Sequence, residues 1–412
     1  MSSVRLKGFE KLTNVDAALS TFYGALGPKR VDAECVDVEN AFGRVVAEDI
    51  IAPVNLPSFY RSAVDGYAVK SEDTIEASQF KSKTLQLIQK GPLRKGQTQR
   101  IWTGNIMPKG ADSAIMLEHV TVKGSKVQIT VSVTPAENVS RKGEDIKEGD
   151  IAIKAATRLQ AHHIGFLAAL GLTHVNAVRK PKVALLPTGN ELVELGTKPK
   201  ENQIINSNRF VMEDLCRELG AEPQYLGVAK DDEKEIAAKI LKGIGNSDIL
   251  ITTGGTSVGM ADLVPMVVNR LGKPGIVVHG LAMRPGMPTA AGILKNKPVF
   301  VLSGNPVAAF FGFEVLVRPT ILKVLGIGSE PRAFVRARLT KRVAGALGRR
   351  VYVRVKAFLK DGDLHAEPIR ARGSSLYSSM VMANGYVVIP ENCEGLERGE
   401  TVDVHLFGPI AS

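Results

Sequence analysis

Four apolar runs of the sequence each end in a segment of glycine and polar residues that could bind an anion. The segments are 188–191 (TGNE), 252–262 (TTGGTSVGMAD), 284–288 (RPGMP) and 303–306 (SGNP). If the runs are strands of an open parallel sheet, the segments follow the carboxyl ends of the strands, where such sheets bind ligands. Glycine turns that enter a helix also direct free backbone N–H groups at an anion. One such turn is commonly only a connection, because the turn itself needs glycine, but four at one edge predict a site for phosphate or another oxyanion.

Carboxylates accompany these segments. Several carboxylates beside an anion would repel it unless Mg²⁺ or protons intervene, so the combination indicates an oxygen-ligated cation that bridges protein and phosphate. The alternative stays open that they face apart and pair with lysine or arginine, since a single loop aspartate is commonly a turn former or a helix cap. The candidates are Asp65, Glu144, Asp145, Glu191, Asp231, Asp232 and Asp262.

The spacing of the glycines argues against two common classes of nucleotide-binding protein. It matches neither GxGxxG nor GxxxxGK[ST], so a dinucleotide-dependent dehydrogenase and a P-loop NTPase both lose their main support. The sequence has no GxSxG elbow and no histidine pair at zinc-binding spacing. Cys35, Cys216 and Cys393 are far apart and odd in number, which indicates neither a disulfide framework nor a cysteine zinc site.

The elements that must position these segments alternate in type from residue 181 onward. Apolar runs at 183–187, 224–229, 248–253, 277–283 and 298–303 are typical of buried strands. Helical patterns occur at 207–219, around Ile236, Ile240 and Ile244, and from 306 to 325. Strands that are apolar throughout, each followed by a helix, predict a parallel sheet covered on both faces.

The 412 residues are too many for one compact core, and the texture of the sequence changes along the chain. We expect an α/β multidomain protein in which a doubly wound, mostly parallel sheet occupies residues 181–329. Helical patterns at 12–26, where Thr13 precedes Asp16 at capping-box spacing, and at 160–172 indicate a discontinuous helical and linking domain over 1–53 and 146–180. Period-2 alternation predicts an inserted β-rich module at 54–145 and a C-terminal β-barrel-like module at 330–412.

The charge is basic but uneven. The formal net charge is +11, and residues 331–372 carry 12 Lys and Arg against 3 Asp and Glu. Such a band is either a solvated face or one wall of an anion-binding cleft, and the sequence leaves both open. One Trp and 5% aromatic residues provide few platforms for stacking bases, so we expect no nucleic-acid partner.

The sequence also argues against a membrane. The longest nearly uncharged apolar run, 307–317, is about half of the roughly 20 residues that a membrane-spanning helix needs. The first residues, MSSVRLKGFE, lack a signal-peptide core, so we expect a cytoplasmic protein without a membrane partner.

Seven segments together resemble the signatures of one family, the molybdopterin molybdenumtransferases, which include the bacterial MoeA type and the C-terminal domain of gephyrin. The α/β segments alone would also fit molybdopterin adenylyltransferases, but that reading leaves three further modules without a role. In order, the segments are SAVDGYAV (62–69), IWTGNIMPKGADSAIMLEHV (101–120), RKGEDI (141–146), LLPTGNEL (185–192), ITTGGTSVGMAD (251–262), RPGMPT (284–289) and LSGNPVA (302–308).

The resemblance implies a fold and a reaction. It implies a four-domain subunit in an elongated homodimer, with the site between the α/β domain of one subunit and a β module of the other. It also implies that molybdate and adenylylated molybdopterin, with Mg²⁺, give molybdenum cofactor and AMP, so the expected partners are small anionic substrates.

The resemblance further implies roles for individual residues. We expect Glu191 and Asp262 to hold Mg²⁺ or orient phosphate cleavage, Asp65 or Asp145 to handle protons, and Asp232 to belong to the same acidic set. Arg284 is the expected cation for molybdate or phosphate. The residues expected to bind the pterin and its phosphate are Thr188, Gly189, Gly254, Gly255, Ser257, Gly259, Arg284, Pro285, Ser303, Gly304 and Asn305.

The chain departs from the family pattern at several of these places. Asn190 stands at a usual Asp, and residues 260–263 read MADL where the family has Glu-Ala-Asp-Tyr. Met287 and Gly280 stand at usual lysines, which removes positive charge from the expected oxyanion site. Arg284 and the basic band could compensate, or the protein could be slow, prefer tungstate, or be a non-catalytic or weakly active molybdopterin-binding scaffold.

Overall fold

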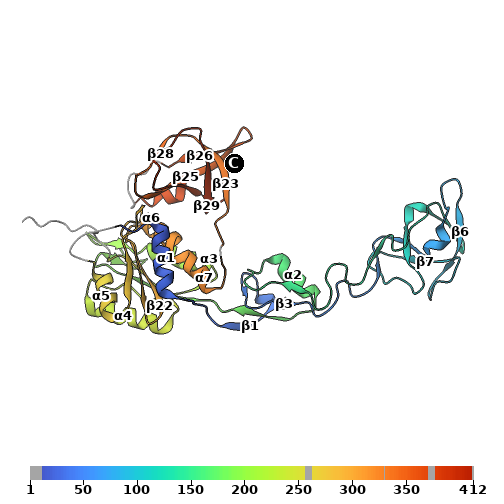
Figure 1. Cartoon of the computed structure of the whole chain (residues 1–412), viewed down its shortest axis with the longest axis horizontal. Coiled ribbons are helices and arrows are strands. Elements are labelled where there is room, and N and C mark those ends of the chain that lie inside the picture. The colour runs from blue at the N-terminus through green and yellow to red at the C-terminus, as the bar shows by residue number, and fades with distance from the viewer. Residues whose placement is uncertain (1–11, 256–261, 329, 370–375, 411–412) are drawn as a thin grey trace, which may run out of the picture. The chain divides into compact units, whose positions relative to one another are not determined.

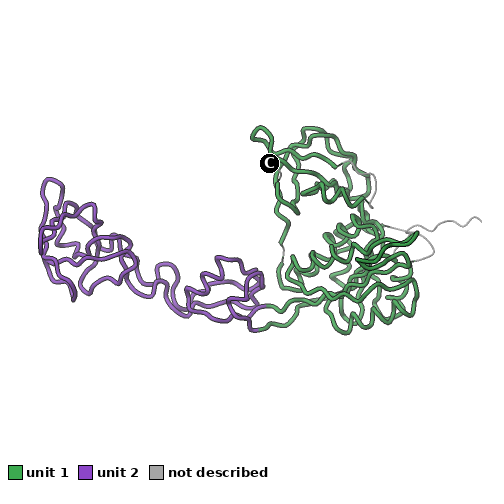
Figure 2. The backbone as a smooth tube through the Cα atoms, turned by 180° about the vertical axis from the view of Figure 1, so that it is seen from behind, with its two compact units in different colours: residues 1–34, 178–412 green, residues 35–177 purple. Residues whose placement is uncertain are grey.

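The computed structural model describes residues 12–255, 262–328, 330–369 and 376–410. The chain forms two compact units (Figure 2). Unit 1 comprises residues 1–34 and 178–412, and unit 2 comprises residues 35–177.

Unit 1 contains the predicted mostly parallel sheet, in the strand order β17-β14-β18-β22-β21-β19. The first four strands are parallel, whereas β21 is antiparallel to both of its neighbours. The sequence analysis did not predict β21. The expectation that a helix follows every strand is wrong there, because β21 leads directly into β22. Lys295 and Asn296 make a tight turn with positive φ between β21 and β22, and this turn reverses the chain. The strands are β14 (Lys182–Pro187), β17 (Glu222–Tyr225), β18 (Ile249–Thr253), β19 (Gly275–His279), β21 (Ala290–Leu294) and β22 (Lys297–Leu302).

Helices cover both faces of this sheet (Figure 1). One face carries α4 (Glu233–Asn246) and α5 (Leu263–Leu271). The other carries α1 (Val15–Leu26), α3 (Asn208–Glu218), and a long helix made of α6 (Pro306–Gly312), a π-helical turn (Phe313–Val317) and α7 (Arg318–Val324). On that second face the ring of Phe22 lies 5.3 Å from the ring of Phe300, measured between centroids.

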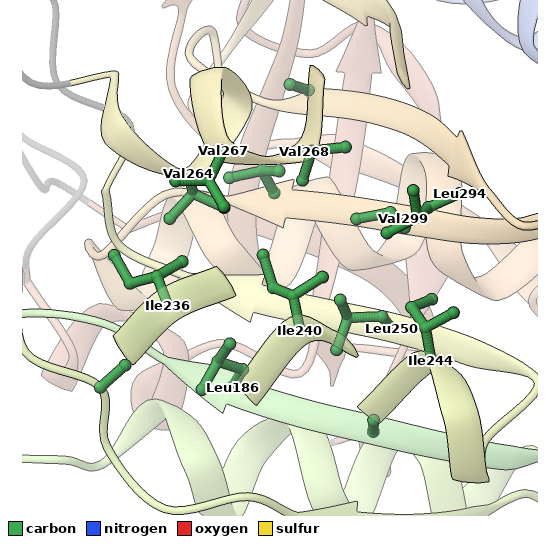
Figure 3. Close-up of a cluster of buried hydrophobic side chains, with 14 residues drawn as sticks. Leu186, Ile236, Ile240, Ile244, Leu250, Val264, Val267, Val268, Leu294 and Val299 are labelled. Carbon is green, nitrogen blue, oxygen red and sulfur yellow. The ribbon is translucent and has the colours of Figure 1, made fainter. Parts of the chain in front are cut away.

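The core under α4 and α5 follows from helical spacing. Ile236, Ile240 and Ile244 recur every four residues, so they share one face of α4 and pack onto Leu186 and Leu250 of the sheet (Figure 3). All five side chains are buried. This packing fixes the position of the loops that leave β14 and β18.

The first helix differs from its prediction in two ways. It begins at Val15, and its N-cap is Asn14, whose side-chain oxygen accepts the backbone N–H groups of Asp16 and Ala17. The predicted cap, Thr13, instead pairs with Leu281 as an isolated bridge. The helix packs within unit 1 rather than with an N-terminal linking domain.

The C-terminal part of unit 1 is the predicted barrel-like module. Its strand order is β20-β25-β26-β23-β29-β27, and an additional β25–β27 pairing closes it. The short strand β20 comes from the α/β sequence and joins this sheet beside β25, so it ties the two parts of unit 1 together. The elements are β20 (Met283–Arg284), β23 (Phe334–Leu339), β24 (Val343–Ala344), β25 (Arg350–Lys360), β26 (Asp363–Pro368), α8 (Ser378–Met382), β27 (Gly385–Ile389), β28 (Gly395–Leu396) and β29 (Thr401–Leu406).

Unit 2 has separate hydrophobic cores. One lies between a three-stranded sheet, β1-β13-β2, and α2 (Ala161–Ala169), and two others pack against a six-stranded sheet, β8-β5-β7-β6-β10-β9. The six-stranded sheet falls within 54–145, where the sequence predicts an inserted module. The strands are β1 (Ala33–Asp37), β2 (Val45–Val46), β3 (Ile50–Ile51), β4 (Arg61–Ser62), β5 (Gly66–Val69), β6 (Lys83–Ile88), β7 (Gln97–Ile101), β8 (Ser113–Met116), β9 (Val120–Lys123), β10 (Lys126–Ile129), β11 (Val139–Ser140), β12 (Ile151–Ile153) and β13 (His174–Val178).

Within the described residues, every helix is too short or too polar to cross a bilayer.

Candidate functional site

Three of the four predicted segments meet at one edge of the sheet in unit 1. They follow β14, β18 and β22, which are neighbours. The Thr188 N–H donates to the Thr253 carbonyl at 2.8 Å, and the Gly254 N–H donates to the Leu302 carbonyl at 3.0 Å. The predicted convergence of these segments is therefore present.

Glycine is required at the turn after β18. Gly254 and Gly255 have φ values of +92° and +66°. A Cβ at Gly254 would lie 2.3 Å from the Thr188 carbonyl oxygen, and one at Gly255 would lie 2.6 Å from Cγ2 of Val264. The turn thus runs directly against the end of β14, and only glycine allows so close an approach.

Two buried oxygens at this edge have no hydrogen-bond partner among the residues that the structure describes. They are Oγ1 of Thr188, a residue only 1% exposed, and Oδ1 of Asp262. Buried polar atoms are normally hydrogen-bonded, so both are suited to a bound ligand, ion or water. Ser257 and Gly259, which the sequence predicts at the same place, lie outside the described residues.

Asp262 faces a histidine that the sequence analysis did not assign. Oδ2 of Asp262 lies 3.5 Å from Nε2 of His279. Burial raises the pKa of Asp262, and the imidazole opposes that rise in part. His279 is the last residue of β19, so the rule that pointed to the other strand ends could also have found it.

In the loop after β14, the side chains of Glu191 and Asn190 have different contacts. The carboxylate of Glu191 lies against Gly189, where a Cβ would be 2.6 Å from both of its oxygens. Asn190 and Asp231 exchange two hydrogen bonds, each from a backbone N–H to a side-chain oxygen at 3.2 Å. An asparagine at 190 therefore avoids placing a second carboxylate beside Asp231.

Asp232 has a structural role. Its Oδ1 accepts the backbone N–H of Glu235 at 2.8 Å, which caps α4. The helix-cap alternative that the sequence left open thus describes Asp232, and its expected catalytic role has no support from the geometry.

A cavity of about 630 Å³ adjoins the turn after β22. Ser303 and Asn305 line it from the α/β side, and β25 forms the opposite side. Three arginines line it, Arg284, Arg349 and Arg354, and none of its described lining residues is acidic. Its charge therefore suits an oxyanion.

The members of the basic band lie in different surroundings, and Arg332 and Arg350 form partly buried ion pairs. Arg349 and Arg354 line the cavity, and Arg354 is 8% exposed, so burial lowers the pKa of its guanidinium. Other members lie on the surface with acidic partners: Arg336 with Asp403, Lys341 with Glu367, and Arg342 with Glu397. Part of the band is thus a solvated face, and another part forms one wall of a cationic cavity. The sequence could not single out the two cavity arginines, because that depends on the register of β25.

The fourth predicted segment is not at a strand end of the α/β sheet. Arg284 lies in β20, paired with the C-terminal module, and with Pro285 and Met287 it lines the cavity. The prediction that Arg284 follows a strand of the α/β sheet is therefore wrong. Its side chain nevertheless lines the cavity that contains Arg349 and Arg354. Gly280, at a usual lysine, has a φ of +84°, and its carbonyl accepts the Thr13 N–H at 3.0 Å.

The two remaining predicted acids belong to unit 2. Oδ1 of Asp65 accepts hydrogen bonds from the backbone N–H and the hydroxyl of Thr103 at 2.8 and 2.7 Å, and these bonds lower the pKa of Asp65. Asp145 is exposed, and its N–H donates to the Leu56 carbonyl.

The carboxylates at this edge fit a magnesium ion whose remaining ligands come from water and from substrate phosphates. The described residues contain no cluster of three or more His, Cys, Asp and Glu side chains. Mg²⁺ usually keeps several waters and binds one or two carboxylates together with substrate phosphates. The open oxygen of Asp262 is a donor of this kind.

Family models match nearly the whole chain: the MoeA N-terminal region (domains I and II) over residues 13–171, a "Probable molybdopterin binding domain" over 184–323, and the MoeA C-terminal region (domain IV) over 336–407. The chain belongs to the MoeA family. The family resemblance predicted from the sequence is confirmed.

MoeA relatives cover almost the full length of the chain. Two curated relatives, from Haemophilus influenzae and Bacillus subtilis, are each 33% identical, cover 93% and 92% of this chain and match over 96% and 91% of their own lengths. Both are named molybdopterin molybdenumtransferase, so the family is one of transferases, as predicted. A solved molybdopterin biosynthesis MoeA protein of Pyrococcus is 36% identical with a TM-score of 0.81, over 97% of this chain and 100% of that one.

Proposed function

We propose that this MoeA-family chain inserts molybdate into adenylylated molybdopterin and releases AMP. The observation that carries the proposal is the cavity with Arg284, Arg349 and Arg354, which adjoins the turn at Ser303. This cationic cavity adjoins the sheet edge that carries the glycine turns and the unpartnered oxygens of Thr188 and Asp262. Such an arrangement suits a reaction between two anions.

The reaction needs both anions held together, because orientation removes much of its entropic barrier. The three arginines bind the tetrahedral oxyanion. The hydroxyl of Thr188, which has no partner among the described residues, binds the phosphate side of the adenylylated pterin. Sulfur atoms of the pterin dithiolene then displace oxo groups, which leave as water after they take up protons from the thiols and the solvent. A water molecule cleaves the phosphoanhydride bond of the adenylylated pterin and gives AMP and the pterin phosphate.

Magnesium fits beside this phosphate. Glu191 and Asp262 are the residues that would hold it, and bound Mg²⁺ neutralises charge on the phosphates. Burial raises the pKa of Asp262 because it destabilises the ionised carboxylate. A cation nearby would stabilise that ionised form.

Asp65 and Asp145 are proposed to handle protons. The hydrogen bonds of Thr103 lower the pKa of Asp65, which favours its carboxylate form and makes it a weak base, so it would hold a proton only briefly during transfer. The proposal includes a cytoplasmic homodimer, and light scattering of the purified chain tests the dimer.

The decisive experiment measures AMP release. Protein, Mg²⁺ and adenylylated molybdopterin are mixed, and molybdate or tungstate is titrated separately. We expect release that depends on the oxyanion and falls strongly in Asp262→Asn and Glu191→Gln. Asp363→Asn, an exposed acid of the C-terminal module, is the matched control. No oxyanion-dependent release at any tested pH would overturn the proposal.

Met287 favours a second candidate, a molybdopterin-binding scaffold with little or no turnover. It lines the cavity where the family usually has lysine, so the cavity has one cation fewer. In that case labelled molybdopterin binds without turnover, and Met287→Lys raises AMP release. Gly280→Lys is a poorer test, because a lysine at a φ of +84° is strained.

A further inference from the structure

A second cationic hollow lies in unit 1, away from the candidate site. It measures about 640 Å³ and lies where the loop after α1 meets the end of α7. Lys29 and Arg30 line it from the loop, and Lys323 lines it from the helix. The remaining lining residues are Tyr23, Pro28, Pro319, Gly326, Ile327 and Gly328.

The three cations lack acidic partners within the part of the chain that the structure describes. None of the lining residues is Asp or Glu, and no ion pair joins Lys29, Arg30 or Lys323 to a carboxylate. The ammonium of Lys323 lies over the ring of Tyr23, 4.6 Å from its centroid. A formal charge of +3 therefore surrounds the hollow.

Further positive groups are close to Lys29. The pKa of Lys297 is lowered, first by burial and also by the charges of Lys29, Arg179 and Lys295, while Asp248 opposes the shift. Asp248 is itself held by two hydrogen bonds from Arg179, each 2.8 Å long. Asp248, with Asp32 and Glu34 acting on Arg179, offsets part of this positive charge, and a bound anion would relieve the remaining repulsion.

Capping of α7 does not account for the cations. Lysine and arginine often lie at helix C-termini, where they can satisfy the last carbonyls. Here backbone N–H groups already occupy the carbonyls of residues 321–324, with Leu325, Gly326, Ile327 and Val31 as donors. The lysine and arginine side chains are free of that role.

The turn after α7 also positions one of the cations. Gly326 has a φ of +80°, and a Cβ there would lie 3.6 Å from Cζ of Arg30. The guanidinium therefore rests close to a bare backbone turn at the rim of the hollow.

We propose that this hollow binds a small phosphate-bearing anion at a site distinct from the proposed catalytic cavity. Three cations match a ligand with two or more negative charges, and the volume is within the range of small-molecule sites. The chemistry is that of a diphosphate group, either free as pyrophosphate or carried by a nucleotide. The inference does not depend on the proposed function.

Calorimetric titration with inorganic pyrophosphate, without Mg²⁺, tests the proposal. We expect wild-type protein to show binding at this hollow and at the catalytic cavity. Arg30→Gln/Lys323→Gln should weaken one of the two sites at least tenfold, and Arg284→Gln should weaken the other. Lys234→Gln/Lys242→Gln, which removes two exposed charges from α4, is the matched control and should change neither.

Hydrogen exchange locates the site independently. Added pyrophosphate should slow exchange at residues 325–328 in wild type and in Arg284→Gln, but not in Arg30→Gln/Lys323→Gln. A nucleoside diphosphate that binds more tightly than pyrophosphate identifies the nucleotide form of the ligand, and equal or weaker binding identifies the free diphosphate. Unchanged binding in Arg30→Gln/Lys323→Gln, or no protection at 325–328, would overturn the proposal.

Discussion

The buried arginine of the cavity beside Ser303 offers the sharpest test of the proposed site. Arg354 lies on β25, is 8% exposed and lines the cavity with Arg284 and Arg349. Replacing it with methionine removes the charged guanidinium but keeps a flexible apolar chain like the stem of arginine. We expect Arg354→Met to bind molybdate more weakly without losing stability.

The magnitude follows from the charge and its burial. At about 5 Å and an effective dielectric constant of about 20, one unit charge attracts another by roughly 3 kcal/mol. Water that remains in the open cavity reduces this value, so we expect a loss of about 2–3 kcal/mol, which is roughly a 30- to 150-fold weaker affinity. Folding penalises the same charge, since burial lowers the pKa of Arg354. This penalty offsets the interaction that Arg354 makes within the protein, so the free energy of unfolding should change by less than about 1 kcal/mol.

Two measurements check both parts. Titration calorimetry at low ionic strength gives the affinity for molybdate, and urea denaturation without ligand gives the free energy of unfolding. Arg336→Met is the matched control, because the Arg336 side chain is 78% exposed on the same module and lies 3.6 Å from Asp403. It should change affinity less than twofold. Wild-type affinity in Arg354→Met would refute the placement of the anion, and a loss of more than about 2 kcal/mol in stability would show that Arg354 holds the module together.

Three further predictions test the surroundings. Gly254→Ala places a methyl group 2.3 Å from the Thr188 carbonyl at a φ of +92°, so the urea midpoint should fall by the equivalent of about 1–3 kcal/mol; an unchanged midpoint contradicts the close approach. The raised pKa of Asp262 means that its contribution to stability is greatest below the ordinary aspartate value of 3.8 and is lost as pH rises through the folded pKa; Asp262→Asn should lack this loss in thermal melts from pH 3 to 8, and parallel curves contradict it. Thr103→Val should raise the pKa of Asp65 in an NMR titration, since both hydrogen bonds that lower it involve Thr103 and one is removed; an unaltered titration means that the hydroxyl is unimportant.

Hydrophobic spacing predicted five helical segments, because a helix that must bury one face repeats its apolar residues, but it did not predict α5. Ile236, Ile240 and Ile244 recur at that spacing, and all three pack on the sheet. The same reasoning failed at β21, whose apolar residues resemble any buried strand. The direction of a strand depends on its connection, and the two-residue turn at Lys295 and Asn296 gave no strong signal.

Asp232 and Asp262, which the sequence places in one acidic set, have different roles in the structure. Asp232 and Asp262 both precede a helix, and sequence alone cannot tell a cap from a ligand. The cap at Asp232 is visible only as a bond to the N–H of Glu235. Asp262 instead turns toward His279, a contact between residues 17 positions apart in the sequence.

By itself, the sequence determined the family, the α/β character of residues 181–329, and the strand ends where glycine and polar residues gather. These features depend on local periodicity and on motifs that are read in order. Tertiary structure decided which charges share a space: Arg349 and Arg354 join Arg284 in one cavity only because β20 pairs with β25. Strand pairing between distant segments depends on packing of the whole unit, so it lies beyond what spacing along the chain can specify.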